Sequence, residues 1–266
     1  MKEVENYYDN SAEREWERLE RHRIEFDITK RYLDKYLNKK SKILDAGGGP
    51  GRYSIYLAKH GHDVTLLDLS LENIKLGIKK SREEGIELND YIHGNVLELS
   101  EKVEGLFDSV LCLGPLYHLT SIEDRKKAIE ECLSKLKKGG KLFVSFITSY
   151  APFIDAFANY PQVISKYKDI FFKFFDDGVN IVTDDNPGFT TAYFINPDEI
   201  EEFMNGFNIK KNVIAGLEGL FAQSESKLYN LPENEYNEWV DVIYRTSTNP
   251  LTWAGSCHML YIGEKY

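Results

Sequence analysis

A carboxylate and a run of glycines stand together near the start of the chain, in the segment Asp45-Ala-Gly-Gly-Gly-Pro-Gly51. Glycines at this density permit a tight turn and let a ligand approach the backbone closely. Asp45 restricts the ligand, because a second negative charge about 4 Å away would cost roughly 4 kcal/mol at an effective dielectric constant near 20. The turn is therefore expected to hold a cationic or neutral group, not a pyrophosphate.

The spacing of these glycines also departs from the pattern of dinucleotide-binding turns. In G-x-G-x-x-G the third glycine would fall at position 52, which is occupied by Arg52. The acid and the spacing together argue against NAD or FAD as the ligand.

The glycine turn is expected to follow a strand and to precede a helix, and the rest of the chain also alternates between strands and helices. Short apolar runs indicate buried strands, and amphipathic segments between them indicate helices, which is the pattern of a parallel α/β sheet. The helix at 121–136 is expected to stop at Gly139 and Gly140. Strands are predicted at residues 43–44, 63–68, 91–96, 106–113, 141–147, 208–215 and 259–263, and helices at residues 53–58, 71–84, 121–136, 197–205 and 233–244.

A second acid, Asp68, ends the second predicted strand, 21 residues after Gly47. At this offset a carboxylate can accept hydrogen bonds from two ribose hydroxyls. Asp68 and Ser70 also precede a predicted helix, where either could serve as the N-cap. Both roles are open for Asp68.

The segment from Asp45 to Gly51 resembles motif I of the class I S-adenosylmethionine-dependent methyltransferases, and the similarity extends over residues 41–147. It implies a Rossmann-like α/β fold with a seven-stranded, mostly parallel sheet, helices on both faces and a last strand that runs antiparallel. It also implies S-adenosylmethionine as the methyl donor. The residues implied for binding are Asp45, Gly47, Gly48, Gly49 and Gly51 at the methionine portion, Asp68 at the ribose, and Asn95 and Val96 at the adenine. Arg52, Leu69 and Leu113 are further cofactor-binding residues. Family members commonly carry an acid where this chain has Asn95, whose carbonyl can still accept from the adenine amino group.

Tyr117 and His118 follow the fourth predicted strand, at the sheet edge where ligands bind in open α/β folds. Either could orient or deprotonate a methyl acceptor, and they are the candidate catalytic residues. Alternatively, His118 caps the next helix and Tyr117 stacks on the cofactor.

Before the first strand, residues 11–37 form a charged helical lead, one helix or two, with Ser11 as a possible N-cap. Such a leading helix closes over the cofactor in many members of the resembled class. The possible lid contacts are Tyr7, Tyr8, Arg14 and Arg23, and Arg23 is the candidate for the cofactor carboxylate.

Residues 150–194 contain twelve of the 35 aromatic residues. They form either a cap over the acceptor pocket or a small helical subdomain that uses the rings for its own core. Residues 184–188 are predicted to form a loop. The expected division is an N-terminal lid over residues 1–40, a methyltransferase core over 41–149 and 195–266, and a cap insertion over 150–194.

A net charge of −10 argues against nucleic acid as a partner, and the chain has neither a predicted signal peptide nor a membrane span. Three widely spaced cysteines fit a reducing cytoplasm. No metal site is predicted, because His60 and His62 flank Gly61, a helix C-cap candidate. We therefore expect a cytoplasmic methyltransferase of a small molecule, with the oligomeric state open. The alternatives are a tRNA-modifying methyltransferase, since residues 44–49 and 61–70 are also similar to enzymes that methylate carboxymethoxyuridine in tRNA, and a non-catalytic protein that binds the cofactor.

Overall fold

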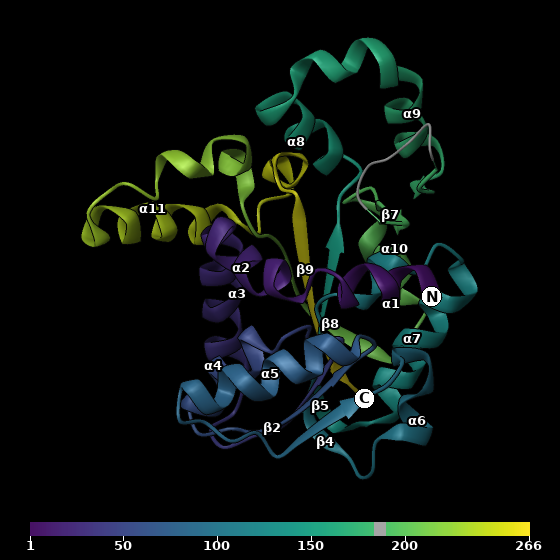
Figure 1. Ribbon diagram of the computed structural model, residues 1–266, viewed down its shortest axis with the longest axis vertical. Coiled ribbons are helices and arrows are strands. Elements are labelled where there is room, and N and C mark those ends of the chain that lie inside the picture. The colour runs from purple at the N-terminus through teal and green to yellow at the C-terminus, as the bar shows by residue number, and fades with distance from the viewer. Residues whose placement is uncertain (184–189) are drawn as a thin grey trace.

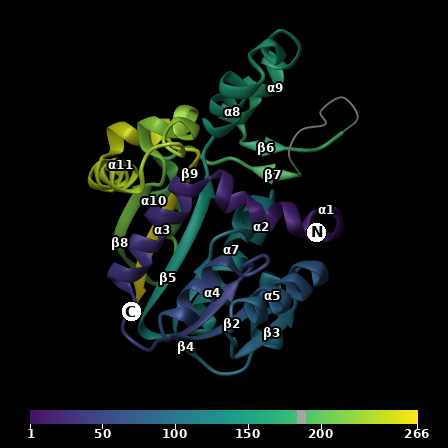
Figure 2. The same cartoon turned by 60° about the vertical axis from the view of Figure 1, so that its left-hand side comes forward.

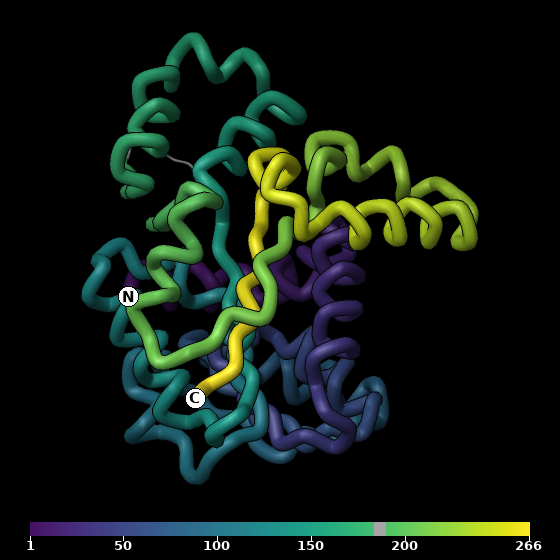
Figure 3. Tube along the Cα trace, turned by 180° about the vertical axis from the view of Figure 1, so that it is seen from behind, coloured from purple at the N-terminus to yellow at the C-terminus, as the bar shows by residue number. Residues whose placement is uncertain are grey.

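A seven-stranded sheet with the order β3-β2-β1-β4-β5-β9-β8 forms the centre of the computed structural model, which describes residues 1–183 and 190–266. The first five of these strands run parallel to their neighbours, and β9 runs antiparallel to both β5 and β8. The predicted mostly parallel sheet with an antiparallel last strand is confirmed, and Figure 3 shows β9 ending near the C-terminus. The strands are β1 (Lys42–Ala46), β2 (Asp63–Asp68), β3 (Asp90–His93), β4 (Phe107–Cys112), β5 (Leu136–Ile147), β8 (Ile209–Gly216) and β9 (His258–Lys265).

Helices cover both faces of the sheet, as predicted, because successive side chains of a strand point to opposite faces and both are apolar here. Ile43 and Leu66 belong to the core on one face, and Leu44 and Leu67 belong to the core on the other. The first face is covered by α3 (Arg23–Tyr36), α4 (Arg52–Lys59), α5 (Leu71–Glu83) and α11 (Glu233–Thr246), and the second by α6 (Leu99–Lys102), α7 (Ile122–Ser134) and α10 (Glu199–Asn205).

The N-terminal lead consists of three helices, α1 (Lys2–Asp9), α2 (Ala12–Arg21) and α3. The predicted helical region over 11–37 is confirmed as two helices, but α1 was not predicted, since its sequence is short and mostly polar. Ser11 stands at the N-cap position of α2 without capping it, because its hydroxyl donates to the carbonyl of Tyr7. Figure 1 shows α1 and α2 crossing in front of the sheet.

The junction between α7 and β5 differs from the prediction. The helix ends at Ser134, and β5 begins at Leu136, five residues before the predicted strand. Leu136 pairs with Phe107, and regular pairing resumes at Lys141 after an irregular stretch in which Gly139 adopts a left-handed φ of 76°. Gly139 and Gly140 therefore lie within the strand and do not terminate the helix.

Residues 151–180 leave the sheet after β5 and form the helices α8 (Ala151–Asn159) and α9 (Ile164–Asp176), which project beyond the body of the molecule (Figures 1 and 2). The strands β6 (Val179–Asn180) and β7 (Ala192–Tyr193) pair as a separate two-stranded sheet. Phe153 stacks on Phe175 with ring centroids 4.7 Å apart, so some of the aromatic residues of this segment pack on one another. The loop predicted at 184–188 lies outside the described residues.

Within the described part of the chain, no helix combines the length and the apolar character that a membrane crossing requires.

Candidate functional site

One pocket gathers most of the predicted site residues at the carboxyl ends of β1, β2 and β4, beneath α1 and α2. It encloses about 870 Å³ of empty space, part of which opens to solvent. Its lining includes these predicted residues: Asp45, Gly47, Gly48, Gly49, Arg52, Asp68, Leu69, Asn95, Val96, Leu113, Tyr117 and His118. Gly51 is not part of the lining and instead precedes α4 at its N-cap position.

The glycine turn lies so close to its neighbours that side chains would not fit. A Cβ atom on Gly47, whose φ is 81°, would lie 2.2 Å from Cγ of Pro115. A Cβ atom on Gly48 would lie 2.4 Å from Oδ2 of Asp45. The turn therefore needs glycine both for its backbone angles and for its close packing.

Asp45 is fully buried directly beside this turn. Its Oδ2 accepts a hydrogen bond from Ser54 at 2.7 Å, whereas Oδ1 has no hydrogen-bond partner among the described residues. Burial raises the pKa of Asp45 to about 7, which the Ser54 bond opposes and the charge of Asp68 reinforces. A carboxylate in this state would be stabilised by a cationic ligand group.

Asp68 connects the turn to the second strand and to α5. Its Oδ2 accepts from the backbone N–H of Gly49 at 2.8 Å, and its Oδ1 accepts from Ser70 N–H at 2.9 Å and Asn73 Nδ2 at 3.1 Å. Burial raises the pKa of Asp68, against these three hydrogen bonds. The helix cap is Ser70, whose Oγ accepts from Asn73 N–H. Of the two predicted cap candidates, the structure thus selects Ser70.

The residues that follow β3 also line the pocket. Asn95 caps the short 3-10 helix Val96–Glu98, because its Oδ1 accepts from Leu97 N–H at 3.0 Å. A carbonyl oxygen has two lone pairs, so this contact is compatible with a second donor.

The helical lead contributes residues that the sequence analysis missed. Glu15 and Arg18 of α2 line the pocket, and Nε of Arg18 lies 3.0 Å from Oε1 of Glu15. The guanidinium of Arg18 also makes two hydrogen bonds to Glu25, at 2.7 and 3.0 Å. Helical spacing was the signal that could have identified Glu15 from the sequence, because Glu15 lies one helical turn before Leu19, which is buried.

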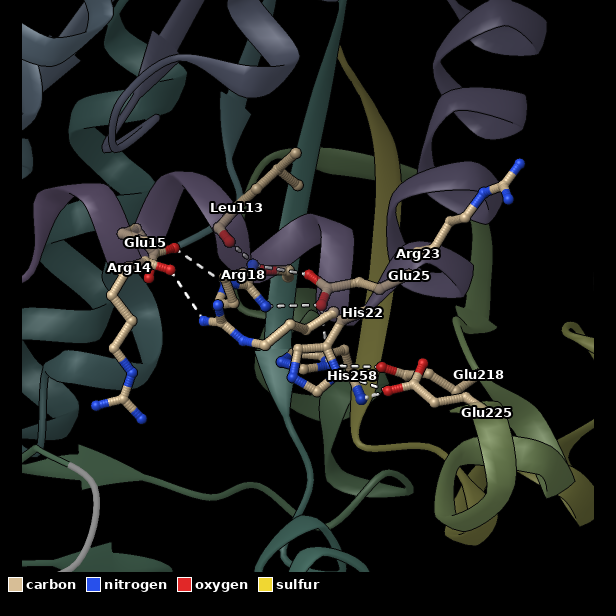
Figure 4. A network of polar contacts seen from close by, with 12 residues as sticks. Arg14, Glu15, Arg18, His22, Arg23, Glu25, Leu113, Glu218, Glu225 and His258 are labelled. Atoms are coloured by element: carbon tan, nitrogen blue, oxygen red, sulfur yellow. Dashed lines mark hydrogen bonds and ion pairs between the residues drawn. The ribbon is translucent and has the colours of Figure 1, made fainter. Parts of the chain in front are cut away.

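Of the predicted lid contacts, the structure places only Tyr8 in the pocket lining. The prediction for Arg23 is wrong, because its guanidinium lies 2.6 Å from Glu233 and over the ring of Tyr236, outside the pocket. Figure 4 shows Arg23 pointing away from Arg18. Tyr7 and Arg14 are also absent from the lining.

Arg52 lines the pocket, but its guanidinium connects two helices. It lies 3.0 Å from Glu20 of α2 and 4.7 Å from the ring centroid of Trp16. These contacts hold α2 against the start of α4.

Tyr117 and His118 lie in the 3-10 helix Pro115–His118 after β4, and both are buried. Nε2 of His118 lies 2.7 Å from the hydroxyl of Tyr8, and Nδ1 lies 3.3 Å from the carbonyl of Thr191. Burial lowers the pKa of His118 to about 4, so the ring is neutral at pH 7. The alternative of a helix cap is wrong for His118, because Ser121 caps α7.

Groups that could bind a metal ion lie elsewhere. Nδ1 of His60 bonds the carbonyl of Tyr56, and Nδ1 of His62 accepts from Ser41 N–H. Among the described residues, Glu25, Glu218 and His258 lie close enough to share an ion, but they are bonded to one another and to Arg18. Cys112, Cys132 and Cys257 are free thiols.

Comparison with known proteins finds a family that matches part of the chain. Residues 43–140 match the family described as "Methyltransferase domain". A ubiquinone biosynthesis O-methyltransferase from Xanthomonas euvesicatoria is 38% identical over 105 residues, 40% of this chain and 42% of that protein. The chain thus spans less than half the length of the curated relatives that it matches.

Solved structures share the fold over nearly the whole chain. A 1,6-didemethyltoxoflavin-N1-methyltransferase from Burkholderia thailandensis matches with a TM-score of 0.61 and 14% identity, covering 98% of this chain and 87% of that one. An S-adenosylmethionine-dependent methyltransferase from Clostridium acetobutylicum has the same TM-score and identity, covering 96% and 98%. Over residues 43–140 the chain therefore matches a methyltransferase domain, and solved S-adenosylmethionine-dependent methyltransferases share its fold.

Proposed function

We propose that the protein transfers a methyl group from S-adenosylmethionine to a small-molecule acceptor. The observation that carries the proposal is the buried carboxylate of Asp45, which has one unpartnered oxygen and lies beside the glycine turn. A pyrophosphate would be repelled there, whereas the ammonium of an amino-acid portion would supply the missing donor. The relatives named as O-methyltransferases and the N-methyltransferase of a small heterocycle support a small acceptor.

The proposed binding residues follow the pocket from one end to the other. Asp45 and the turn would hold the methionine portion, Asp68 the ribose, and Asn95 with Val96 the adenine. Arg18 replaces Arg23 as the candidate for the cofactor carboxylate. The bonds to Glu15 and Glu25 use three of its five N–H groups, which leaves donors for a ligand.

S-adenosylmethionine supplies a methyl group on a sulfonium centre, which a nucleophile displaces in line. The chain's contribution would be to position the acceptor and to exclude water from it. Residues 1–40 act as the lid in this proposal, since Tyr8, Glu15 and Arg18 line the pocket from above. Residues 150–194 act as the cap, since Phe174 and Phe194 pack in one cluster with Tyr117.

Calorimetric titration with S-adenosylmethionine, S-adenosylhomocysteine and NAD in parallel tests the proposal. We expect micromolar binding of the first two ligands and none of NAD. Binding of NAD alone would overturn the assignment of Asp45 and with it the proposed function.

The pKa of Asp45 predicts how cofactor affinity depends on pH. The carboxyl must be ionised to bind an ammonium group, and a pKa of about 7 leaves it mostly protonated at pH 6. Affinity for S-adenosylhomocysteine should therefore rise about eightfold between pH 6 and pH 7.5, with nearly one proton released on binding at pH 6. Calorimetry in buffers of different ionisation enthalpy measures both quantities.

The matched variant for this experiment is Asp45→Asn, which keeps the shape of the side chain and removes its titration. It should bind more weakly at pH 7.5 and release no proton at pH 6. Equal affinity of the unaltered protein at both pH values would refute the role of Asp45.

A further inference from the structure

The lid and the loop after β4 meet at one hydrogen bond inside the pocket. Tyr8 comes from α1, His118 lies 110 positions later, and the two rings meet edge to face with centroids 5.3 Å apart. Both residues line the pocket beside the glycine turn. This bond therefore occupies space that a ligand next to the cofactor portion would need.

The direction of this bond follows from the other nitrogen of the ring. Nδ1 of His118 faces the carbonyl of Thr191 at 3.3 Å, and a carbonyl can only accept, so Nδ1 carries the hydrogen. The ring is neutral, because burial lowers its pKa to about 4. Nε2 is then a lone-pair acceptor, and the hydroxyl of Tyr8 donates to it at 2.7 Å.

We infer that Nε2 of His118 receives the hydroxyl of the methyl acceptor, that this acceptor is phenol-like, and that the phenol of Tyr8 occupies its place until the acceptor displaces it. The inference rests on the proposed function and names the acceptor class of the same site. His118 is thereby a catalytic residue and Tyr8 a competitor of the acceptor.

The helix that carries Tyr8 is weakly anchored. It is eight residues long, and Val4 is its only fully buried residue. Polar contacts near the surface hold its two ends, where Asp9 accepts from Ser70 at 2.6 Å and Glu3 accepts from Thr191 at 3.2 Å. Helices this short are marginal on their own, so α1 stays over the pocket only through these contacts.

The surroundings of His118 favour a neutral aromatic hydroxyl over other acceptor groups. A lone pair on Nε2 would repel a carboxylate, and an aliphatic ammonium group offers no nucleophilic lone pair. A neutral aromatic amine such as aniline is a weaker hydrogen-bond donor than a phenol. The ring of Tyr117 lies 4.8 Å from the imidazole and joins a cluster with Phe174 and Phe194. Burial raises the pKa of both Tyr8 and Tyr117, so these two phenols are protonated at neutral pH.

The reaction balances with this assignment. The acceptor oxygen forms a bond to the methyl carbon while the sulfur–carbon bond breaks and its electron pair stays on sulfur. The hydroxyl proton passes to Nε2 of His118 as the oxygen loses it. The resulting imidazolium returns the proton to water, because a pKa of about 4 does not retain it at neutral pH.

The experiment uses phenol, aniline and benzoate as probes, with the Tyr8→Phe variant and Tyr36→Phe as its control. Tyr36 belongs to the same helical lead but not to the pocket lining. With S-adenosylmethionine present, phenol should be the methylated probe. Tyr8→Phe should lower the KM for phenol about three- to tenfold and leave kcat within about twofold, because one competing hydrogen bond is lost. Tyr36→Phe should change neither, and a raised KM or a lower kcat in Tyr8→Phe would overturn the inference.

A spectroscopic readout covers the case in which phenol is not turned over. In the complex with S-adenosylhomocysteine, millimolar phenol should shift the ¹⁵N resonance of His118 Nε2, and more strongly in Tyr8→Phe. Absence of that shift in both proteins, or a stronger response to aniline or benzoate, would overturn the inference. Failure of S-adenosylhomocysteine to bind at all would instead remove the proposed function, so the two failures are distinguishable.

Discussion

Replacing Asp68 by alanine is expected to abolish cofactor binding while leaving the fold intact. The carboxylate would accept two ribose hydroxyls, and hydrogen bonds to a charged group are worth about 1.5–3 kcal/mol each. Their loss should weaken S-adenosylhomocysteine binding by more than about 100-fold. The same carboxylate fixes the amide of Gly49, so the turn also loses its support on the β2 side. Calorimetry measures the affinity, and circular dichroism measures the fold.

The fold should tolerate this change because the charge of Asp68 is already disfavoured where it lies. Burial raises its pKa, so removing it relieves a buried charge while three donors lose their acceptor. Asp68→Asn keeps one acceptor oxygen and should bind at an intermediate level. Asp63→Ala, at the exposed start of the same strand, should bind normally. Unchanged affinity in Asp68→Ala would remove the ribose assignment.

The sequence predicted those parts of the fold that local patterns determine. The strand over residues 63–68 is found with these bounds, because an apolar run between Gly61 and Asp68 has one plausible extent. The start of β5 was missed by five residues, because pairing of Leu136 with Phe107 overrides the turn preference of Gly139 and Gly140. Register between distant strands is a tertiary effect that a local pattern does not encode.

The residues of the candidate site also fall into two groups, those that local patterns predict and those that depend on tertiary packing. Asp45 and Asp68 each lie at the carboxyl end of a recognisable strand, so their meeting at one sheet edge was predictable. Arg18 was not, since its selection over Arg23 depends on Glu25 and on the way in which α2 crosses the pocket. The contact of Tyr8 with His118 was also beyond reach, because α1 itself was not predicted from its polar sequence.

Arg18 belongs to a buried network that joins the lid to the far end of the chain (Figure 4). Glu25 of α3 is 5% exposed and bonds Arg18, and Nδ1 of His258 lies 3.5 Å from it. His258 in turn lies 2.6 Å from Glu218, and His22 lies 2.6 Å from Glu225. Glu25 therefore lies between Arg18 and His258, and the orientation of Arg18 toward the pocket depends on it.

Replacing Glu25 by glutamine is expected to destabilise the protein by about 3–5 kcal/mol, because Glu25 is buried and the guanidinium of Arg18, which is 23% exposed, then loses its main counter-charge. Urea unfolding measures this loss. The same experiment on Glu17→Gln provides the control, since Glu17 pairs with Arg21 at the surface and should contribute less than about 1 kcal/mol. A loss for Glu25→Gln as small as that of the control would mean that the network does not hold the lid.

The dependence of stability on pH identifies the source of this loss. Burial alone would raise the pKa of Glu25, but Arg18 and His258 lower it from its ordinary 4.5 to about 2. A depressed pKa gives stability that is present above pH 4.5 and lost as the pH falls toward 2, about 3 kcal/mol in all. Burial alone would lower the pKa of His258, but Glu25 and Glu218 raise it above its ordinary 6.5. The stability that His258 contributes is therefore present below pH 6.5 and is lost as the pH rises through the higher pKa of the folded state. These two groups together favour the folded state most between about pH 4.5 and 6.5, and Glu25→Gln should flatten the acid limb of the stability curve because the group that titrates there is gone.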